Sequence, residues 1–353
     1  MLEEIRQQPT AIARTLKAEW RSIGQLKAHF SQHQPRMIVL AARGTSDNAA
    51  YFGRYLLEIT TGIPVSLAAP SVYTLYRSRL QLREVLLVAI SQSGESTDIN
   101  IVLEEAKNTG AMTIGITNEP ESTITKLAGH TIQVRAGKER SVAATKTYTG
   151  QLFALYLLAY ALGAPLKYED LRRVPELASA ALRLDDEIAE RAQRYRFMDH
   201  AVVVGRGLNY STSFEFALKL METCYVIAER FSSADLLHGP IAMLEASFPA
   251  FVLAPCGVTW PPIRELIERL RSIKAETLVF TDRSNREIRE LRGFEKNTVI
   301  IPAPLYRKSS PPEDLYTPIP YIVPGQLFAA HLADVKGLDP DKPRTLSKVT
   351  QTI

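Results

Sequence analysis

Short runs of Val, Ile and Leu recur along the chain and alternate with stretches whose apolar residues follow the helical period. Runs that are apolar throughout are typical of strands buried on both faces, and their alternation with helices favours parallel βαβ units. The pattern predicts helices at about 47–58 and 97–109, with Gly110 ending the second. The predicted strands lie within 37–44, 84–94, 113–118, 130–134, 200–207, 248–257, 277–282 and 297–301.

The second half of the chain repeats the first. MIVLAARG at 37–44 matches HAVVVGRG at 200–207, and the two Arg-Gly pairs are 206 − 43 = 163 residues apart. EVLLVAISQSG, ending at Gly94, and FPAFVLAPCG, ending at Gly257, keep the same offset of 163. A repeat this long is typical of a duplicated domain rather than of a solenoid. We therefore expect an α/β protein with two tandem domains, each a parallel-sheet αβα sandwich.

Charge and helical period mark the segments outside these two copies. The stretch 166–194 is charged and periodic, which favours a helical linkage. Pro-rich segments at 261–265, 309–325 and 339–344 predict loops or turns. The predicted order is an N-terminal helical segment (1–30), a first domain (31–165), a helical linker (166–195), a second domain (196–335) and a C-terminal tail (336–353).

Composition excludes several classes of protein. Hydrophobic residues make up 46% of the 353 residues and charged residues 23%, as in ordinary globular proteins. The net charge of +4 is too small and too evenly spread for a nucleic-acid surface. Two cysteines fit a reducing compartment, and no metal-ligand spacing occurs, so we expect no metal and no cofactor. The N-terminus lacks a signal-peptide core and the longest apolar stretch, 152–162, is too short to span a bilayer, so we expect a cytoplasmic protein without membrane partners.

Two strand ends in the first copy are rich in hydroxyl side chains: Arg-Gly-Thr-Ser at 43–46 and Ser-Gln-Ser-Gly-Glu-Ser-Thr at 91–97. Each leads directly into a predicted helix, so free backbone N–H groups and the positive end of the helix dipole would face a bound anion. Ser46 and Ser96 could instead be simple helix N-caps. The second copy has Ala-Pro-Cys-Gly at 254–257 where the first has Ser-Gln-Ser-Gly, so the fold does not require serines there. A phosphate site is therefore favoured.

In their order and spacing, these motifs resemble the sugar isomerase (SIS) domain family. S-Q-S-G-E-S-T-D at 91–98, G-T-S at 44–46 and V-A-A-T-K at 142–146 are similar to the isomerase half of glucosamine-6-phosphate synthase and to its stand-alone relatives. The resemblance covers about residues 5–353 and implies two tandem SIS domains of flavodoxin-like fold. The motifs that the second half adds are A-L-K-L-M-E at 217–222, A-E at 228–229, L-H-G-P at 237–240 and D-K-P-R-T-L-S-K at 341–348.

The resemblance implies a role for individual residues. Glu222 would be the base that moves a proton between C1 and C2 of a sugar phosphate, and Lys219 would assist at the sugar oxygens. His238 would open the sugar ring from the neighbouring subunit, which implies a homodimer. Lys348 would close over the substrate. The implied substrate-binding residues are Thr45, Ser46, Ser91, Gln92, Ser93, Ser96, Val142 and Ala143.

The residues themselves support these roles unequally. Lys219 and Glu222 are three positions apart and share a helix face, where a solvated pair is the usual outcome. The helix around them is apolar nearly all round, and a carboxylate that loses water holds a proton more readily, as a general base near neutral pH must. A single His in a loop, such as His238, is more often structural. By itself, Lys348 in a Pro-interrupted tail indicates a solvated terminus.

The sequence also departs from the synthase pattern. It begins Met1-Leu2, without the N-terminal Cys nucleophile of the amidotransferase half, so we do not expect it to draw ammonia from glutamine. E-R-S-V-A-A-T-K at 139–146 resembles the stand-alone deaminases more than the synthases. The other departures are Arg43 in place of Cys, Ser141 in place of Gly, Met221 in place of Lys and Asp235 in place of Glu.

Three functions are compatible with these motifs. The leading interpretation is a glucosamine-6-phosphate deaminase that also isomerises, giving fructose 6-phosphate and ammonia. A second is cleavage of a fructosamine-type 6-phosphate adduct, or plain aldose–ketose isomerisation. A third is a non-catalytic sensor of sugar phosphates. A sensor needs the hydroxyl loops but not Glu222, His238 and Lys348, so the presence of all three favours an enzyme.

Overall fold

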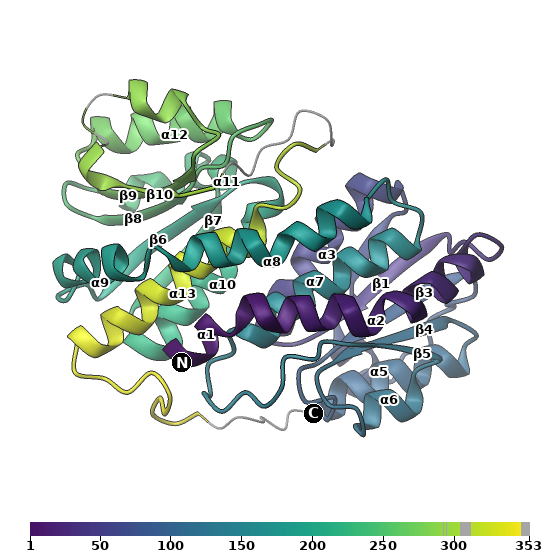
Figure 1. Ribbon diagram of the computed structural model, residues 1–353. Helices are drawn as coiled ribbons and strands as arrows, with labels where there is room; N and C mark the ends of the chain where they lie inside the picture. The colour runs from purple at the N-terminus through teal and green to yellow at the C-terminus, as the bar shows by residue number, and fades with distance from the viewer. Residues whose placement is uncertain (292, 294, 304–311, 347–353) are drawn as a thin grey trace. The chain divides into compact units, whose positions relative to one another are not determined.

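The computed structural model describes residues 1–291, 293, 295–303 and 312–346 (Figure 1). Its contacts divide the chain into two compact units, and each is described by itself. The first-sheet unit contains Gln7–Arg140, Ala144–Pro175, Thr345 and Leu346. The second-sheet unit contains Met1–Arg6, Ser141–Ala143 and Glu176–Arg344.

The first-sheet unit is built on a five-stranded parallel sheet with the strand order β2-β1-β3-β4-β5. Its strands are β1 (Met37–Ala41), β2 (Val65–Leu67), β3 (Val85–Ile90), β4 (Met112–Thr117) and β5 (His130–Gln133). Its helices are α2 (Gln8–Phe30), α3 (Thr45–Thr61), α4 (Pro70–Thr74), α5 (Thr97–Asn108), α6 (Thr123–Leu127), α7 (Lys146–Ala161) and the first half of α8 (Tyr168–Leu182).

Helices cover both faces of the first sheet (Figure 1). One face carries α5 and α6, where Val39 and Leu87 of the sheet join a buried apolar cluster with Val102 of α5. The other face carries α2, α3 and α7, and α7 is buried along nearly its whole length. Because every central strand is covered twice, its side chains are apolar in both directions. The helices predicted at 47–58 and 97–109 are confirmed as parts of α3 and α5.

The second-sheet unit repeats this plan. Its parallel sheet has the order β10-β9-β8-β6-β7. Read from the opposite edge, this is the strand order of the first sheet. Its strands are β6 (His200–Gly205), β7 (Ile227–Ser232), β8 (Pro249–Leu253), β9 (Glu276–Asp282) and β10 (Thr298–Ile301). Its α-helices are α1 (Leu2–Arg6), the rest of α8, α9 (Asp185–Arg194), α10 (Tyr210–Cys224), α11 (Ser233–Leu237), α12 (Trp260–Ser272) and α13 (Pro318–Val335). Short 3₁₀ turns are η1 (Gly207–Asn209), η2 (Pro240–Met243), η3 (Glu287–Glu290) and η4 (Glu295–Asn297).

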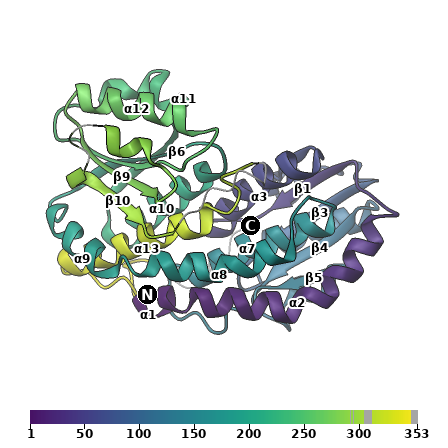
Figure 2. The same cartoon turned by 45° about the horizontal axis from the view of Figure 1, so that its top comes forward.

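Aromatic packing fixes α10 and α13 on one face of the second sheet, and α11 and α12 lie on the other (Figure 2). Phe216 of α10 packs edge-on against Phe251 and Phe280 of the sheet, with ring centroids 5.2 and 5.7 Å apart. It also meets Phe328 of α13 at 5.9 Å. Such edge-to-face contacts add about 0.5–1.5 kcal/mol each to the burial of the rings. This packing holds α10, and with it Lys219 and Glu222, rigidly on the sheet.

The predicted fold is confirmed: two parallel αβα sandwiches with the same strand order, as duplication requires. Each sheet also has a strand that the apolar runs did not predict, β2 in the first and β7 in the second. Both are edge strands, and in β7 four of six positions are at least partly exposed. An edge strand needs no continuous apolar run, so this signal is absent from the sequence.

The prediction that the Pro-rich segments are loops is wrong for two of them. Residues 261–265 lie in the first turns of α12, where a missing N–H removes no helical hydrogen bond. Residues 318–325 form the first half of α13, in which Pro324 lies inside the helix. The side chains of α13 are buried nearly all round, and this burial outweighs the lost hydrogen bond. Residues 312–317 and 339–344 do form loops and turns, and 309–311 lie outside the described residues.

Candidate functional site

The two hydroxyl-rich loops meet at the point where the first sheet changes direction. From β1 the chain moves to the edge strand β2, and it then returns to β3 on the other side of β1. Ligands of open parallel sheets bind at such a switch point, beyond the carboxyl ends of the strands. Ala41 of β1 pairs with Ala89 of β3, so both strands end at the same edge. The loops that follow them lead into α3 at Thr45 and into α5 at Thr97.

Serine side chains hold the loop between β3 and α5 in shape. The backbone N–H of Gly94 donates to Ser91 Oγ at 3.1 Å, and the N–H of Glu95 donates to Ser93 Oγ at 3.2 Å. The hydroxyls of Ser91 and Ser96 are 3.3 Å apart. Gly94 has a φ of 67°, and a Cβ at this position would overlap the Ser122 side chain. Only glycine fits such a turn without strain.

Helix capping, the alternative to a phosphate site, does not explain Ser46 and Ser96. Ser96 occupies the N-cap position of α5, but its side chain makes no capping hydrogen bond. Ser46 lies inside α3, whose N-cap is Gly44. The Ser46 Oγ instead accepts a hydrogen bond of 2.9 Å from Nε2 of Gln151 on α7. Neither hydroxyl is therefore used to begin a helix.

These hydroxyl oxygens accept hydrogen bonds from the protein and keep protons to donate. Ser46 accepts from Gln151, and Ser91 and Ser93 accept from backbone N–H groups. Ser91 and Ser96 lie close enough for one hydroxyl to donate its proton to the other. In the described part of the chain, no other protein group accepts a proton from these serines. At least three of four hydroxyl protons thus remain for a ligand that accepts hydrogen bonds. A phosphate group offers several such acceptor oxygens.

The remaining loop residues lie beside these serines. The backbone carbonyl of Gln92 accepts hydrogen bonds from the N–H of Asn118 at 3.1 Å and from Thr117 Oγ1 at 3.3 Å. The Gln92 side chain is half-buried, as is that of Thr45 in the first turn of α3. The bonds from Asn118 and Thr117 anchor this loop to the end of β4.

A salt bridge connects the two loops. Nε of Arg43 donates to Oδ2 of Asp98 at 2.6 Å, and the Asp98 side chain is 1% exposed whereas that of Arg43 is 51% exposed. Burial raises the pKa of Asp47, in the first turn of α3, and the nearby charge of Arg43 lowers it in part. Arg43 therefore lies between the starts of α3 and α5.

The matching edge of the second sheet has a different character. Its loop at 254–257 contains Cys256 in place of a serine, and burial raises the pKa of the Cys256 thiol. The neighbouring charges that raise this pKa further are all acidic: Asp282, Glu287 and Glu313. A thiol is a weaker hydrogen-bond donor than a serine hydroxyl, so the hydroxyl loops of the first sheet are the better anion site.

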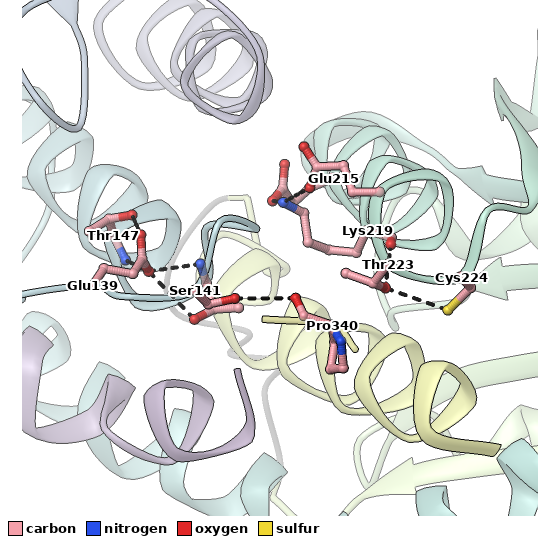
Figure 3. Close-up of polar contacts among 10 residues, drawn as sticks. Glu139, Ser141, Thr147, Glu215, Lys219, Thr223, Cys224 and Pro340 are labelled. Carbon is pink, nitrogen blue, oxygen red and sulfur yellow. Dashed lines mark hydrogen bonds and ion pairs between the residues drawn. The ribbon is translucent and has the colours of Figure 1, made fainter. Parts of the chain in front are cut away.

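A buried ion-pair cluster occupies one face of α10 (Figure 3). Lys219 is fully buried, and its Nζ lies 2.6 Å from Oε2 of Glu222 and 3.2 Å from Oε1 of Glu215. Burial acts to lower the pKa of Lys219, but the charges of Glu215 and Glu222 outweigh it and hold this pKa above its ordinary range. Lys219 is therefore a fixed ammonium that orients the Glu222 carboxylate.

The sequence identified Lys219 and Glu222 but missed Glu215. Its spacing of four residues from Lys219 was the available signal. The Glu215 side chain is 0% exposed, whereas that of Glu222 is 23% exposed. The buried environment that the sequence predicted for Glu222 is therefore found mainly at Glu215. Glu222 is partly open to solvent.

His238 lies on the surface at the end of α11. Its side chain is exposed, and its backbone N–H closes the helix by donating to Ala234 and Asp235. Among the described residues, none forms a hydrogen bond, an ion pair or a ring contact with the imidazole. Asp235 and Ser232 begin the helix with reciprocal hydrogen bonds, since Ser232 Oγ accepts from the Asp235 N–H and donates to its carboxylate. The Asp side chain at position 235 is long enough to form this cap, so the longer Glu of the synthase pattern is not needed there.

The segment that includes Val142 and Ala143 belongs to the second-sheet unit. The Val142 N–H donates to the carbonyl of Asp341 at 3.3 Å, and Ser141 Oγ donates to the carbonyl of Pro340 at 3.4 Å (Figure 3). Ala143 is buried and Val142 half-buried. These contacts place the two predicted sugar-lining residues beside the C-terminal segment.

Glu139 fixes the chain that follows this segment. Its Oε1 accepts from the backbone N–H groups of Thr145 and Thr147 at 2.9 and 3.2 Å, and its Oε2 accepts from Thr147 Oγ1 at 2.6 Å. It thus satisfies free N–H groups at the start of α7. The sequence gave Glu139 no role, although an acidic residue before a helix is a known capping signal.

Lys348 lies outside the described residues. Within the described ranges, no three His, Cys, Asp or Glu side chains are grouped as a metal site needs. Among the same residues, no helix combines the length and hydrophobicity that crossing a membrane requires.

Comparison with known proteins follows the same division of the chain. The SIS domain family matches residues 32–161 and 196–304. The glutamine–fructose-6-phosphate aminotransferase (isomerizing) of Pyrococcus horikoshii is 35% identical over 354 residues, which cover 99% of this chain and 57% of that protein. The chain thus spans little more than half the length of this curated relative.

Two solved structures resemble the whole chain. The C-terminal domain of glucosamine-fructose-6-phosphate aminotransferase from Francisella tularensis has a TM-score of 0.86 and 28% identity, over 97% of this chain and 98% of that one. Glucosamine-6-phosphate deaminase from Thermotoga maritima has a TM-score of 0.76 over 99% of each chain. Its 22% identity shows a shared fold alone.

Proposed function

The chain belongs to the SIS domain family, and from this premise we propose that it is a phosphosugar isomerase that deaminates glucosamine 6-phosphate to fructose 6-phosphate and ammonia. The observation that carries the proposal is the pair of hydroxyl loops at the switch point of the first sheet. Their serines accept hydrogen bonds from the protein and keep their protons for an acceptor. A phosphate bound there would also face the N-termini of α3 and α5.

The proposed chemistry uses the cluster on α10. Glu222 removes the proton from C2 of the open-chain amino aldose and returns it at C1, while a second proton passes from the amino group to O1. The C1 aldehyde becomes an alcohol and an imine is left at C2. Water adds to this imine, and ammonia leaves as the ketose forms. Lys219, held by Glu215, orients the Glu222 carboxylate, and its positive charge assists at the sugar oxygens while their charge develops. The balance closes with one water consumed and one ammonia released.

Incubation of the purified chain with glucosamine 6-phosphate tests this proposal directly. We expect release of ammonia and fructose 6-phosphate in equal amounts, with no glutamine present. A coupled enzymatic assay for fructose 6-phosphate and a separate assay for ammonia measure the two products independently. Isomerised product without ammonia would favour a plain aldose–ketose isomerase. Cleavage of a fructosamine 6-phosphate instead would keep the proposed chemistry but change the substrate. Binding of glucosamine 6-phosphate without any product would exclude the deaminase and favour the sensor.

We also propose that the protein acts as a homodimer in the cytoplasm and that His238 serves the partner subunit. Its exposed imidazole favours a role outside its own fold. Refolding Glu222→Gln chains together with His238→Ala chains should restore part of the activity, because one hybrid site then holds both native groups. Each variant refolded alone is the control. Hybrid dimers that form without recovered activity would contradict the exchange of His238.

A further inference from the structure

The charge of Arg43 has no part in the function proposed above. The two loops with the first residues of their helices, 43–47 and 91–98, contain one basic residue, Arg43, and three acids, Asp47, Glu95 and Asp98. A phosphate dianion at these loops would therefore meet carboxylates at the starts of both helices. Hydroxyl and backbone donors do not cancel such charges, so the site needs a cation.

Arg43 is held where this cation is needed. Its Nε donates to Oδ2 of Asp98 at 2.6 Å, and the other oxygen of Asp98 accepts from the N–H of Ile99 at 2.9 Å. Asp98 is almost fully buried, so it is a fixed anchor at the first turn of α5. Among the described residues, the Arg43 guanidinium makes no other hydrogen bond, and half of the side chain is exposed.

The guanidinium group suits a second, simultaneous partner. It has five N–H donors in one plane, and the bond through Nε uses one of them. The four N–H groups of Nη1 and Nη2 remain, in the fork that matches two oxygens of a phosphate. Because Nε is anchored, little conformational freedom is lost when an anion binds.

We propose that Arg43 is a specificity-determining residue whose terminal nitrogens bind the phosphate group of the substrate. The proposal rests on the proposed function, since it concerns the ligand of the same loops. Asp98 is then a positioning residue that acts through Arg43. The pair makes the site selective for phosphorylated sugars over neutral ones, because an unphosphorylated sugar leaves the guanidinium without its second partner.

The variant Arg43→Ala/Asp98→Asn tests this contact. Arg43→Ala alone would leave the buried Asp98 without its cation, whereas the double variant removes one positive and one negative charge and keeps the net charge of the loops. We expect KM for glucosamine 6-phosphate to rise about 10- to 100-fold with kcat changed less than about threefold. Arg43→Lys should give an intermediate KM, because lysine keeps the charge but not the fork.

Two comparison variants separate the possible outcomes. Ser93→Ala should also raise KM, and Ser31→Ala, at the far end of the sheet, should not change it. Melting temperatures confirm that each variant is folded. A raised KM in Ser93→Ala together with a wild-type KM in the double variant would show that Arg43 only neutralises Asp98, and the inference would fail. An unchanged KM in both would remove the loops from the site, and the proposed function would fail with it.

Discussion

Glu222→Gln lowers kcat for glucosamine 6-phosphate by about 10²–10⁴-fold, with little change in KM. Glutamine keeps the shape of the side chain and its hydrogen bond from Lys219, but it cannot accept the proton from C2. Binding at the serine loops does not involve this carboxylate, so affinity should be retained. Steady-state kinetics that follow ammonia and fructose 6-phosphate give kcat and KM separately.

Glu265→Gln is the matched control for this experiment. Glu265 is exposed on α12, so its substitution should leave both constants within about twofold of wild type. Proton exchange at C2 gives a second reading, since substrate in heavy water should acquire deuterium with the wild-type protein and not with Glu222→Gln. A variant that keeps the wild-type kcat would exclude Glu222 as the base.

Lys219→Met destabilises the second-sheet unit by about 3–5 kcal/mol. The substitution removes the ammonium that lies between Glu215 and Glu222 and leaves the fully buried Glu215 next to an apolar side chain. A buried carboxylate without its cation is costly to desolvate. We expect the thermal transition of this unit to fall by roughly 6–20 °C, measured by calorimetry.

The double variant Glu215→Leu/Lys219→Met distinguishes the ion pair from the loss of the lysine stem. Two apolar side chains of similar volume should recover most of the lost stability, because neither leaves a charge buried. Lys17→Met, at an exposed position of α2, should change stability by less than about 0.5 kcal/mol. Equal destabilisation of the single and double variants would mean that packing rather than charge explains the loss.

The sequence determined the plan of this protein because that plan depends on local patterns. Strands covered on both faces are largely apolar, so β1, β3, β4, β6, β8 and β9 could be located directly from the apolar runs. The edge strands β5 and β10 were located in the same way because they also contain short apolar runs. Duplication followed from the constant offset between these runs. The hydroxyl loops followed from the same pattern, since ligands of parallel sheets bind where such strands end.

Other features depend on which residues meet after the chain has folded. The edge strands β2 and β7 pair along one side only, so they need no apolar run. Pro324 lies in a helix because burial of α13 outweighs one missing hydrogen bond. The low helix propensity of proline does not take this burial into account.

The contacts that give the candidate site its chemistry were likewise decided by the tertiary structure. Gln151 donates to Ser46 across 105 positions of sequence, and Arg43 reaches Asp98 across 55. Glu215 lies on the same helix as Lys219, yet only its burial in the folded chain shows that it is the enclosed partner of that lysine. Sequence pattern identifies residue types and their spacing. The tertiary structure decides which of them lose water and which keep protons or charge for a ligand, because desolvation and hydrogen bonding depend on neighbours that are distant in the chain.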